Sequence, residues 1–588
     1  MSFRNGSAGH GYFGNDANAA NTPRPSQRKE TAQECRYPFL HPVIPYIRDI
    51  ISVSTVCELF DIFLTDPGSS LFHCASPFIL TKIFRKRSIL HPTKPRRTTP
   101  ALIATILWCV AQTADIMILQ VPGSRPRILN QLYDVITSLI SQRDPDRWRH
   151  VDGSLRADKD AAGHGLDGSL VSPPATPANE VVGEIDDVLT FLLLTITVSG
   201  LDCKPDCQKW WSKATRLVIS LRLNREDERC LEAEQPCPNP LCVCQRTQLE
   251  PTLANMEQRE ERRRVFWLCF SLDRHLALSF NSTVLIPDSC CEVYAPLPET
   301  VWENLDSIPL GDLPNRTLAP PVTATGTSFF EYFLPLMVIL GDIIEIHHRR
   351  QHPRLGGDDN DHFVLSIRKL LEQYEVSLET LDENPHRPNS TTFPHEVTST
   401  TNSDIRHEAP TSRGSSDQAQ LQIVRAYGRH IMHVLYVLLY GKWDAICMMD
   451  DDDGWITSGG FGECASHAIS ASQTIATILE IDPELTFMSY LFGIYLLHGS
   501  FIFLLFADRM PQLGPNQSVE LACENIIRAH EVSIVTLNTE FQRTFRKVLR
   551  STLYSVRGHN GANMEAHRAR RRVLSLYRWT KGVRGLNI

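Results

Sequence analysis

The chain has 588 residues, of which 42% are hydrophobic and 21% charged, and a net charge of −8 at a pI near 6.2. These values are typical of a soluble globular protein with a large core. The acidic balance excludes attraction of nucleic acid or anionic lipid by net charge, so any DNA contact would need a local patch or a partner.

The first 36 residues are polar and rich in Gly and Asn, which predicts a disordered N-terminal tail at 1–36. They contain no apolar stretch that could serve as a signal peptide, and this indicates an intracellular protein. The 16 cysteines are therefore expected to be reduced thiols.

Helices are predicted soon after the tail. Thr55 followed by Glu58 forms a capping-box pattern and predicts the start of the first helix. Apolar residues at helical spacing predict two more, over 102–114 and 129–140.

A basic segment lies between the first two of these helices and is interrupted by Pro92 and Pro95. Its usual interpretation is a solvated loop, and the alternatives are a nuclear-import signal or a nucleic-acid contact. The candidate import residues are Arg85, Lys86, Arg87, Lys94, Arg96 and Arg97.

Residues 142–180 are polar and rich in Gly, Pro and Asp, without periodicity, which predicts an insertion loop. Apolar spacing then predicts helices over 185–198 and 210–221. The second of these carries Arg216, and Arg222 follows it. Both are candidate partners for a buried carboxylate further along the chain.

Four cysteines lie within fifteen residues, at Cys230, Cys237, Cys242 and Cys244. Such thiols could bind zinc, but Cys242 and Cys244 are only one residue apart, whereas paired zinc ligands usually have two to four residues between them. The prolines around them favour a polar surface loop, so these four are weak metal candidates and no metal site is predicted.

The segment 260–281 predicts a central helix that is apolar on nearly every side and therefore buried, after a charged leader at 257–264. Asp273 and Arg274 lie inside this apolar run, and a buried charge needs a partner. Arg216 or Arg222 is expected to pair with Asp273. One interpretation is a structural core ion pair; the other is that Asp273, Arg274 and His275 line a regulatory pocket, with Arg274 meeting an effector.

The second half continues with helical spacing, and no alternating strand pattern appears. Four consecutive aspartates at 450–453 lack the ligand spacing of a calcium loop and predict a solvated turn. The chain is therefore predicted to be all-α. Helices are expected at 329–347, 363–381, 421–440, 462–480, 484–507, 516–538 and 563–577, with a proline-rich loop at 281–321 and a disordered linker at 383–417.

One segment, 487–507, has 21 residues without a charged side chain and is long enough to span a membrane. It also contains Ser489, His498 and Ser500 and has no cluster of Lys or Arg on either flank. A buried helix in a large bundle is favoured, and a membrane anchor is the alternative.

Three stretches resemble a known family. Arg262–Arg264, the pair Phe266-Trp267 and the run from Asp273 to Leu278 resemble the middle homology region of fungal zinc-cluster transcription factors. The stretches 76–115 and 576–580 resemble its xylanolytic and arabinanolytic activator branch.

The resemblance, from about Tyr37 onward, implies a regulatory middle region at 37–382 and a C-terminal helical region at 418–588 that packs on it. The zinc cluster of this family needs six cysteines in a repeated frame, but only Cys35 precedes residue 57, so the chain is expected to lack the DNA-binding domain. No cofactor is expected here, because zinc would belong to that cluster.

By this resemblance the chain would be a nuclear transcription regulator that senses an effector and controls carbohydrate-related genes. Its partners would be the transcription machinery or a family homologue and a small-molecule inducer, with DNA contacted only indirectly and no membrane. No enzyme motif is present, and an enzyme is not expected. The alternatives are a stand-alone module that modulates an intact family member, or a protein anchored in a membrane through 487–507.

Overall fold

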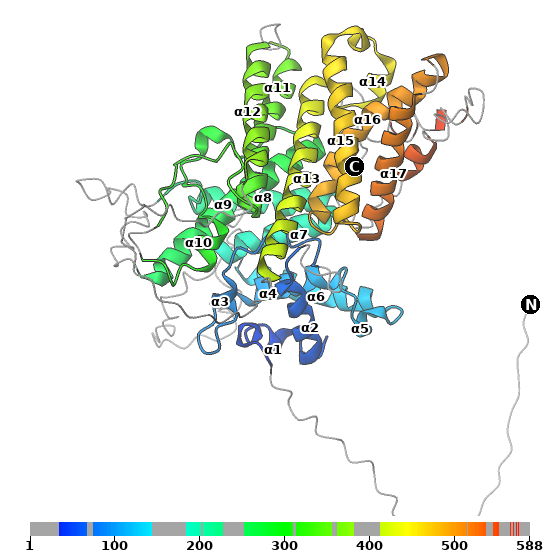
Figure 1. The fold of residues 1–588 in the computed structure, drawn as a ribbon. Helices are drawn as coiled ribbons and strands as arrows, with labels where there is room; N and C mark the ends of the chain where they lie inside the picture. The colour runs from blue at the N-terminus through cyan, green and yellow to red at the C-terminus, as the bar shows by residue number, and fades with distance from the viewer. Residues whose placement is uncertain are drawn as a thin grey trace, which may run out of the picture.

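Helices make up the architecture of the computed structural model, and its described part contains no strand, only an isolated bridge between Arg225 and Glu292. The prediction of an all-α fold is confirmed (Figure 1). The structure describes residues 35–67, 75–143, 184–200, 204–226, 252–309, 313–354, 361–381, 412–513, 516–536 and 545–551, with a few positions between 565 and 574.

The N-terminal helices form the lower group in Figure 1, coloured blue to cyan. Cys35 and Arg36 belonged to the predicted tail, yet Arg36 already forms an ion pair with Asp61 of this group. The helices are α1 (Ile44–Ile47), α2 (Val53–Leu64), α3 (Lys86–Ile89), α4 (Pro100–Ala111), α5 (Met117–Gln120) and α6 (Ser124–Arg143).

Two N-caps show why these helices start where they do. The Ser52 hydroxyl accepts a hydrogen bond from Thr55 N at 3.2 Å, so Ser52 is the cap of α2 and the predicted Thr55 cap is wrong by one turn. Thr99 caps α4 in the same way and is followed by Pro100, whose missing N–H costs nothing in the first turn.

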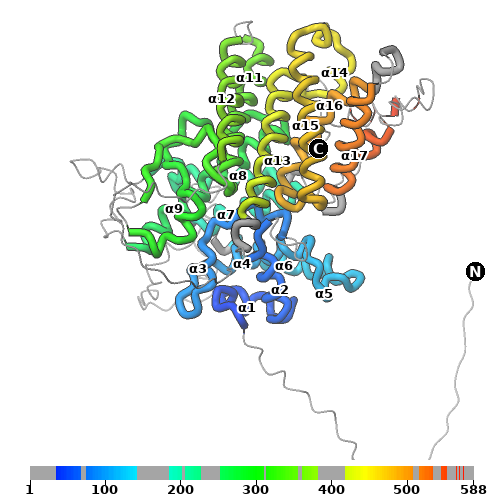
Figure 2. Tube along the Cα trace, in the orientation of Figure 1, coloured from blue at the N-terminus to red at the C-terminus, as the bar shows by residue number. Residues whose placement is uncertain are grey.

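The remaining helices form the middle and upper groups, and Figure 2 traces the chain through them from cyan to orange. They follow the predicted order closely, and α13 begins at Ser412, so the end of the predicted linker is helical. They are α7 (Glu184–Gly200), α8 (Lys204–Ser220), α9 (Leu253–Phe280), α10 (Glu299–Glu303), a π-helical turn η8 (Phe329–Phe333), α11 (Leu334–Arg350), α12 (Asp361–Glu379), α13 (Ser412–Tyr440), α14 (Ala445–Asp450), α15 (Gly459–Ile481), α16 (Ser489–Leu513) and α17 (Gln517–Thr536).

One apolar core joins the two halves of the chain. A continuous cluster of buried side chains extends from Phe39 to Leu574. Helix α13 packs along α15 and also contacts α11 and α12, while α9 contacts α7, α11 and α16. The boundary between a middle region at 37–382 and a C-terminal region at 418–588 stays a prediction, but the two share this core.

Helix α16 contains the one stretch of the described chain that is long and apolar enough to cross a membrane, Ser489–Phe506, with a mean hydropathy of 1.7. In the fold, 78% of this stretch is buried, and α16 packs against α13, α14, α15 and α17. Such burial is typical of a core helix, which supports that interpretation over an anchor.

Several predicted segments lie outside the described residues. These are the tail up to residue 34, most of the insertion at 142–180, most of the linker at 383–417, and nearly all of the helix at 563–577.

Candidate functional site: the buried charges of helix α9

Helix α9 is the element around which the polar interior is arranged. It begins at the Thr252 cap, whose hydroxyl accepts from Asn255 N at 3.3 Å, and ends at Asn281, which takes the left-handed conformation that closes a helix (φ 48°). The segment predicted as a charged leader is largely inside the protein: Glu260 is 1% and Arg264 0% exposed. A carboxylate and a guanidinium buried to this degree require close partners.

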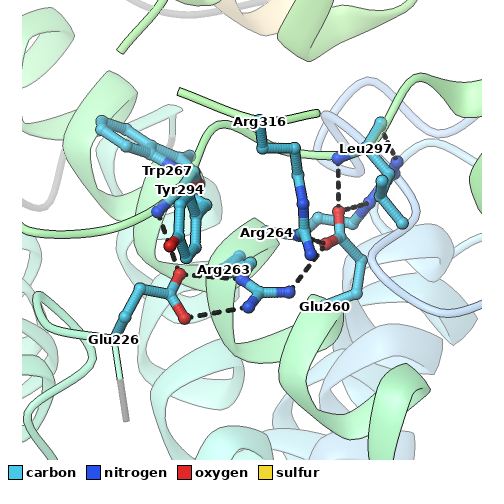
Figure 3. Close-up of polar contacts among 8 residues, drawn as sticks. All are labelled: Glu226, Glu260, Arg263, Arg264, Trp267, Tyr294, Leu297 and Arg316. Carbon is cyan, nitrogen blue, oxygen red and sulfur yellow. Dashed lines mark hydrogen bonds and ion pairs between the residues drawn. The ribbon is translucent and has the colours of Figure 1, made fainter. Parts of the chain in front are cut away.

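Glu260 is the centre of a polar network (Figure 3). Its Oε1 accepts from Leu297 N at 2.7 Å and from Arg264 Nε at 3.3 Å. Its Oε2 lies 3.0 Å from Arg316 Nη1 and 3.5 Å from Arg263 Nη1. One carboxylate therefore ties its own helix to the loop after it and to the segment that contains Arg316.

Arg263 and Arg264 extend the network in two directions (Figure 3). Arg263 makes a two-pronged contact with Glu226, at 2.7 Å from Nε and 2.9 Å from Nη2. Arg264 donates to Glu299 at 2.7 Å and to Leu297 O at 2.8 Å. Charge-assisted bonds of this geometry are the strong class of hydrogen bond and offset the desolvation of the guanidinium groups.

Glu226 also fixes the segment that follows α9 (Figure 3). Its Oε1 accepts from Tyr294 N at 2.9 Å, and Tyr294 O in turn accepts from Trp267 Nε1 at 2.9 Å. No local sequence pattern connects Glu226, Glu299 or Arg316 with α9, because each lies outside this helix along the chain. The available signal was the Glu260–Arg264 pair, four residues apart on one helix face.

Two of the predicted import residues, Arg85 and Arg96, pair with carboxylates of α9. Arg96 donates to Glu261 from Nε at 3.0 Å and from Nη2 at 2.9 Å, and it lies 2.9 Å from Asp186. Arg85 is 2% exposed and forms ion pairs with Glu257 and Asp306.

Of the other four residues of the basic segment, two form ion pairs and two are exposed to solvent. Lys86 pairs with Asp66, and Arg87 with Asp306 at 2.8 Å, whereas Lys94 and Arg97 are exposed. The segment is neither a solvated loop nor an accessible run of six cations, because Arg85 and Arg96 hold carboxylates inside the fold.

The second half of α9 buries its charge differently. Asp273 is 1% exposed, and its Oδ2 accepts from Leu285 N at 2.8 Å and from Ile286 N at 2.9 Å. Burial raises the pKa of Asp273, although these amides and Arg274 act in the opposite direction. The expected pairing of Asp273 with Arg216 or Arg222 is wrong: both arginines are exposed, and the loop that follows α9 supplies the partners.

Arg274 is an interior structural cation. Its Nη1 lies 3.3 Å from Asp273, its Nη2 donates to Asp288 at 2.8 Å, and its guanidinium stacks 3.3 Å from the centre of the Phe270 ring. Its side chain is 0% exposed, and these contacts are those of a core ion pair. A regulatory pocket at Asp273, Arg274 and His275 stays a prediction.

His275 completes this part of the helix. Its ring lies between Tyr490 and Tyr495, with centroids at 5.4 and 6.1 Å. Burial lowers the pKa of His275 to about 3, so it is neutral at physiological pH. A neutral ring held between two aromatic rings is a packing element.

The weak metal candidates Cys230, Cys237, Cys242 and Cys244 lie outside the described residues. Within the described ranges, no group of three or more His, Cys, Asp or Glu side chains is placed to hold a metal ion, and every cysteine there is free.

The part of the chain that contains this network matches a known protein family. Residues 186–377, which include all of α9, match the fungal specific transcription factor domain. The chain is 40% identical over 96% of its length to the xylanolytic transcriptional activator of Emericella nidulans. By this match, 186–377 is a fungal specific transcription factor domain.

Other relatives carry the same name. The chain is 38% identical to the xylanolytic transcriptional activator of Aspergillus clavatus and 38% identical to that of Aspergillus niger, each over 94% of its length. It covers 65%, 60% and 61% of the lengths of the three relatives, in the order given. The family and these relatives are named for transcription, not for an enzyme activity. No solved structure matches the chain.

Proposed function

We propose that this protein is the regulatory region of a transcription regulator that controls genes for xylan breakdown and acts in the nucleus. The observation that carries the proposal is the 40% identity to a xylanolytic transcriptional activator over 96% of this chain. Its partners would be the transcription machinery or a family homologue that contacts DNA, and its input a small-molecule inducer.

The geometry supports a regulatory role for the whole helical body. The α9 network joins segments that are far apart in the chain: Glu261 and Asp186 meet at Arg96, and the neighbouring Glu260 holds Leu297 and Arg316. Long-range ion pairs of this kind restrict how the helices can move relative to one another, so the domain can adopt only a small number of arrangements. A regulatory switch requires such discrete states.

The experiment is a domain exchange. In a strain without its own xylanolytic activator, the matching region of the Emericella nidulans activator is replaced by this chain, and a xylan-responsive reporter is measured. We expect the chimera to restore the response, whereas the same protein without the exchanged region does not. A silent reporter, although the chimera accumulates in the nucleus, would contradict the proposal.

The same experiment examines the stand-alone module. If the chain acts by joining an intact family member, co-expressing it unfused with that member changes the reporter signal. The chimera would then stay inactive.

A further inference from the structure

A cavity of the described part lies at the junction of the two halves of the chain, and Arg274 is not among its lining residues. It has a volume of about 590 Å³, which is in the range of small-molecule sites. Its walls come from the end of α2, from 75–82, from α10 and η8, from the start of α13, and from 486–491 at the start of α16.

Aromatic side chains form the apolar part of the wall. Phe329, Tyr332 and Phe487 all line the cavity, and the rings of Tyr332 and Phe487 are stacked, with centroids 6.0 Å apart. Flat apolar surfaces of this kind bind the apolar face of a ligand.

One wall residue has an unused polar atom. The Ser76 hydroxyl is buried, with the residue only 4% exposed, and its Oγ makes no hydrogen bond within the described part of the fold. A buried hydroxyl without a partner costs free energy. A ligand that carries a hydroxyl or carbonyl group would give Ser76 a partner.

The charges around the cavity argue against an anionic ligand. Lys82 lies 2.5 Å from Asp66, and Lys86 is paired with the same carboxylate, so each lysine already has an ionic partner. Glu299 and Glu303 also line the cavity; Glu299 is held by Arg264 at 2.7 Å. Burial and, after it, repulsion by Glu299 raise the pKa of Glu303, and an anionic ligand would add to that repulsion.

We propose that this cavity is the effector site, and that it takes an uncharged, hydroxyl-bearing small molecule with one apolar face. The assignment as an effector site rests on the proposed function; the binding itself does not. A ligand here would contact Glu299, which is tied to Arg264 of α9, and Phe487, which leads into α16. It would therefore hold the middle and C-terminal parts of the chain together.

The test measures thermal unfolding of the full chain with four separate probes: D-xylose and myo-inositol as uncharged hydroxylated compounds, spermidine as a cation, and citrate as an anion. We expect Tm to rise with the concentration of at least one uncharged probe and to stay constant with the two charged ones. A rise with spermidine or citrate alone, or with none of the four, would overturn the proposal.

Two variants locate the binding. Thr327→Trp fills the cavity, and the matched control Thr325→Trp places the same side chain at an exposed position outside the lining. We expect Thr327→Trp to weaken binding of the uncharged probe by about tenfold or more, and Thr325→Trp to leave it unchanged. Equal binding by both variants would place the ligand elsewhere.

Ser76→Ala separates ligand contact from folding. Because Ser76 Oγ has no partner in the fold, the variant should keep the Tm of the free protein while binding the probe more weakly. A lower Tm without ligand and unchanged probe binding would make Ser76 structural. If binding holds but the domain-exchange reporter is silent, the pocket stands and the proposed function fails.

Discussion

Helix α9 buries charge in two different ways along its length. In its first half, Glu260 and Arg264 are paired with groups far away in the chain, such as Leu297 and Glu299. In its second half, Asp273 is satisfied by two amides of the loop that directly follows, at Leu285 and Ile286. The first half therefore pairs its charges with segments before and well after α9, whereas the charges of the second half are satisfied by the loop that follows.

This difference has an energetic consequence. Removing one member of a buried ion-pair network strands several charges at once, because each side chain serves two or three partners. Removing Asp273 strands two backbone amides and leaves Arg274 with Asp288 as its ionic partner. Stability should thus be more sensitive in the first half of α9 than in the second.

The largest effect is expected for Arg264→Ala. The substitution removes one donor each from Glu260, Glu299 and Leu297 O, and we expect a loss of about 3 to 5 kcal/mol in the free energy of unfolding. Urea unfolding measures it, with the exposed Arg127→Ala as matched control. A loss no larger than that of the control would mean that the network does not stabilise the fold.

A smaller loss, about 2 to 4 kcal/mol, is expected for Asp273→Ala, because two buried amides lose a charged acceptor. Combining it with Arg222→Ala should give an additive result, since the two residues are not partners. A coupling energy above about 0.5 kcal/mol between Asp273 and Arg222 in a double-mutant cycle would show that the two residues do interact.

A third expectation concerns pH and α16. Burial lowers the pKa of His498 from 6.5 to about 3, so below pH 6.5 the unfolded chain binds a proton that the folded chain does not. This residue therefore reduces stability as the pH falls from 6.5 towards 3. His498→Phe should remove about 2 kcal/mol of the loss between about pH 7 and about pH 5. An unchanged pH profile would show that folding does not lower the pKa of His498.

The smallest effect is expected in the basic segment. Lys94→Ala and Arg97→Ala should each change the free energy of unfolding by less than about 0.5 kcal/mol, because both side chains are exposed. Arg96→Ala should be clearly larger, since Arg96 holds both Asp186 and Glu261. Chemical unfolding of the three variants side by side checks the order, and an Arg96→Ala loss equal to the other two would contradict it.

The sequence by itself determined the all-α class, most helices and the burial of the second half of α9. These follow from apolar spacing, which is a local property: the periodicity over 102–114 and 421–440 predicts α4 and α13 from their own residues. The cap of α2 was missed by one turn because Ser52 and Thr55 are both acceptable caps, and only the backbone geometry distinguishes them.

Only the tertiary structure decided where the charges go. Arg96 meets Glu261 across 165 positions of sequence, and no periodicity connects them. The same limit explains why the pairing of Asp273 with Arg216 or Arg222 is wrong. A buried carboxylate needs hydrogen-bond donors, but these donors can be backbone amides instead of a cation. The packing of segments that are distant in the chain decides which donors lie next to the carboxylate. The same packing forms the cavity at the junction of these segments.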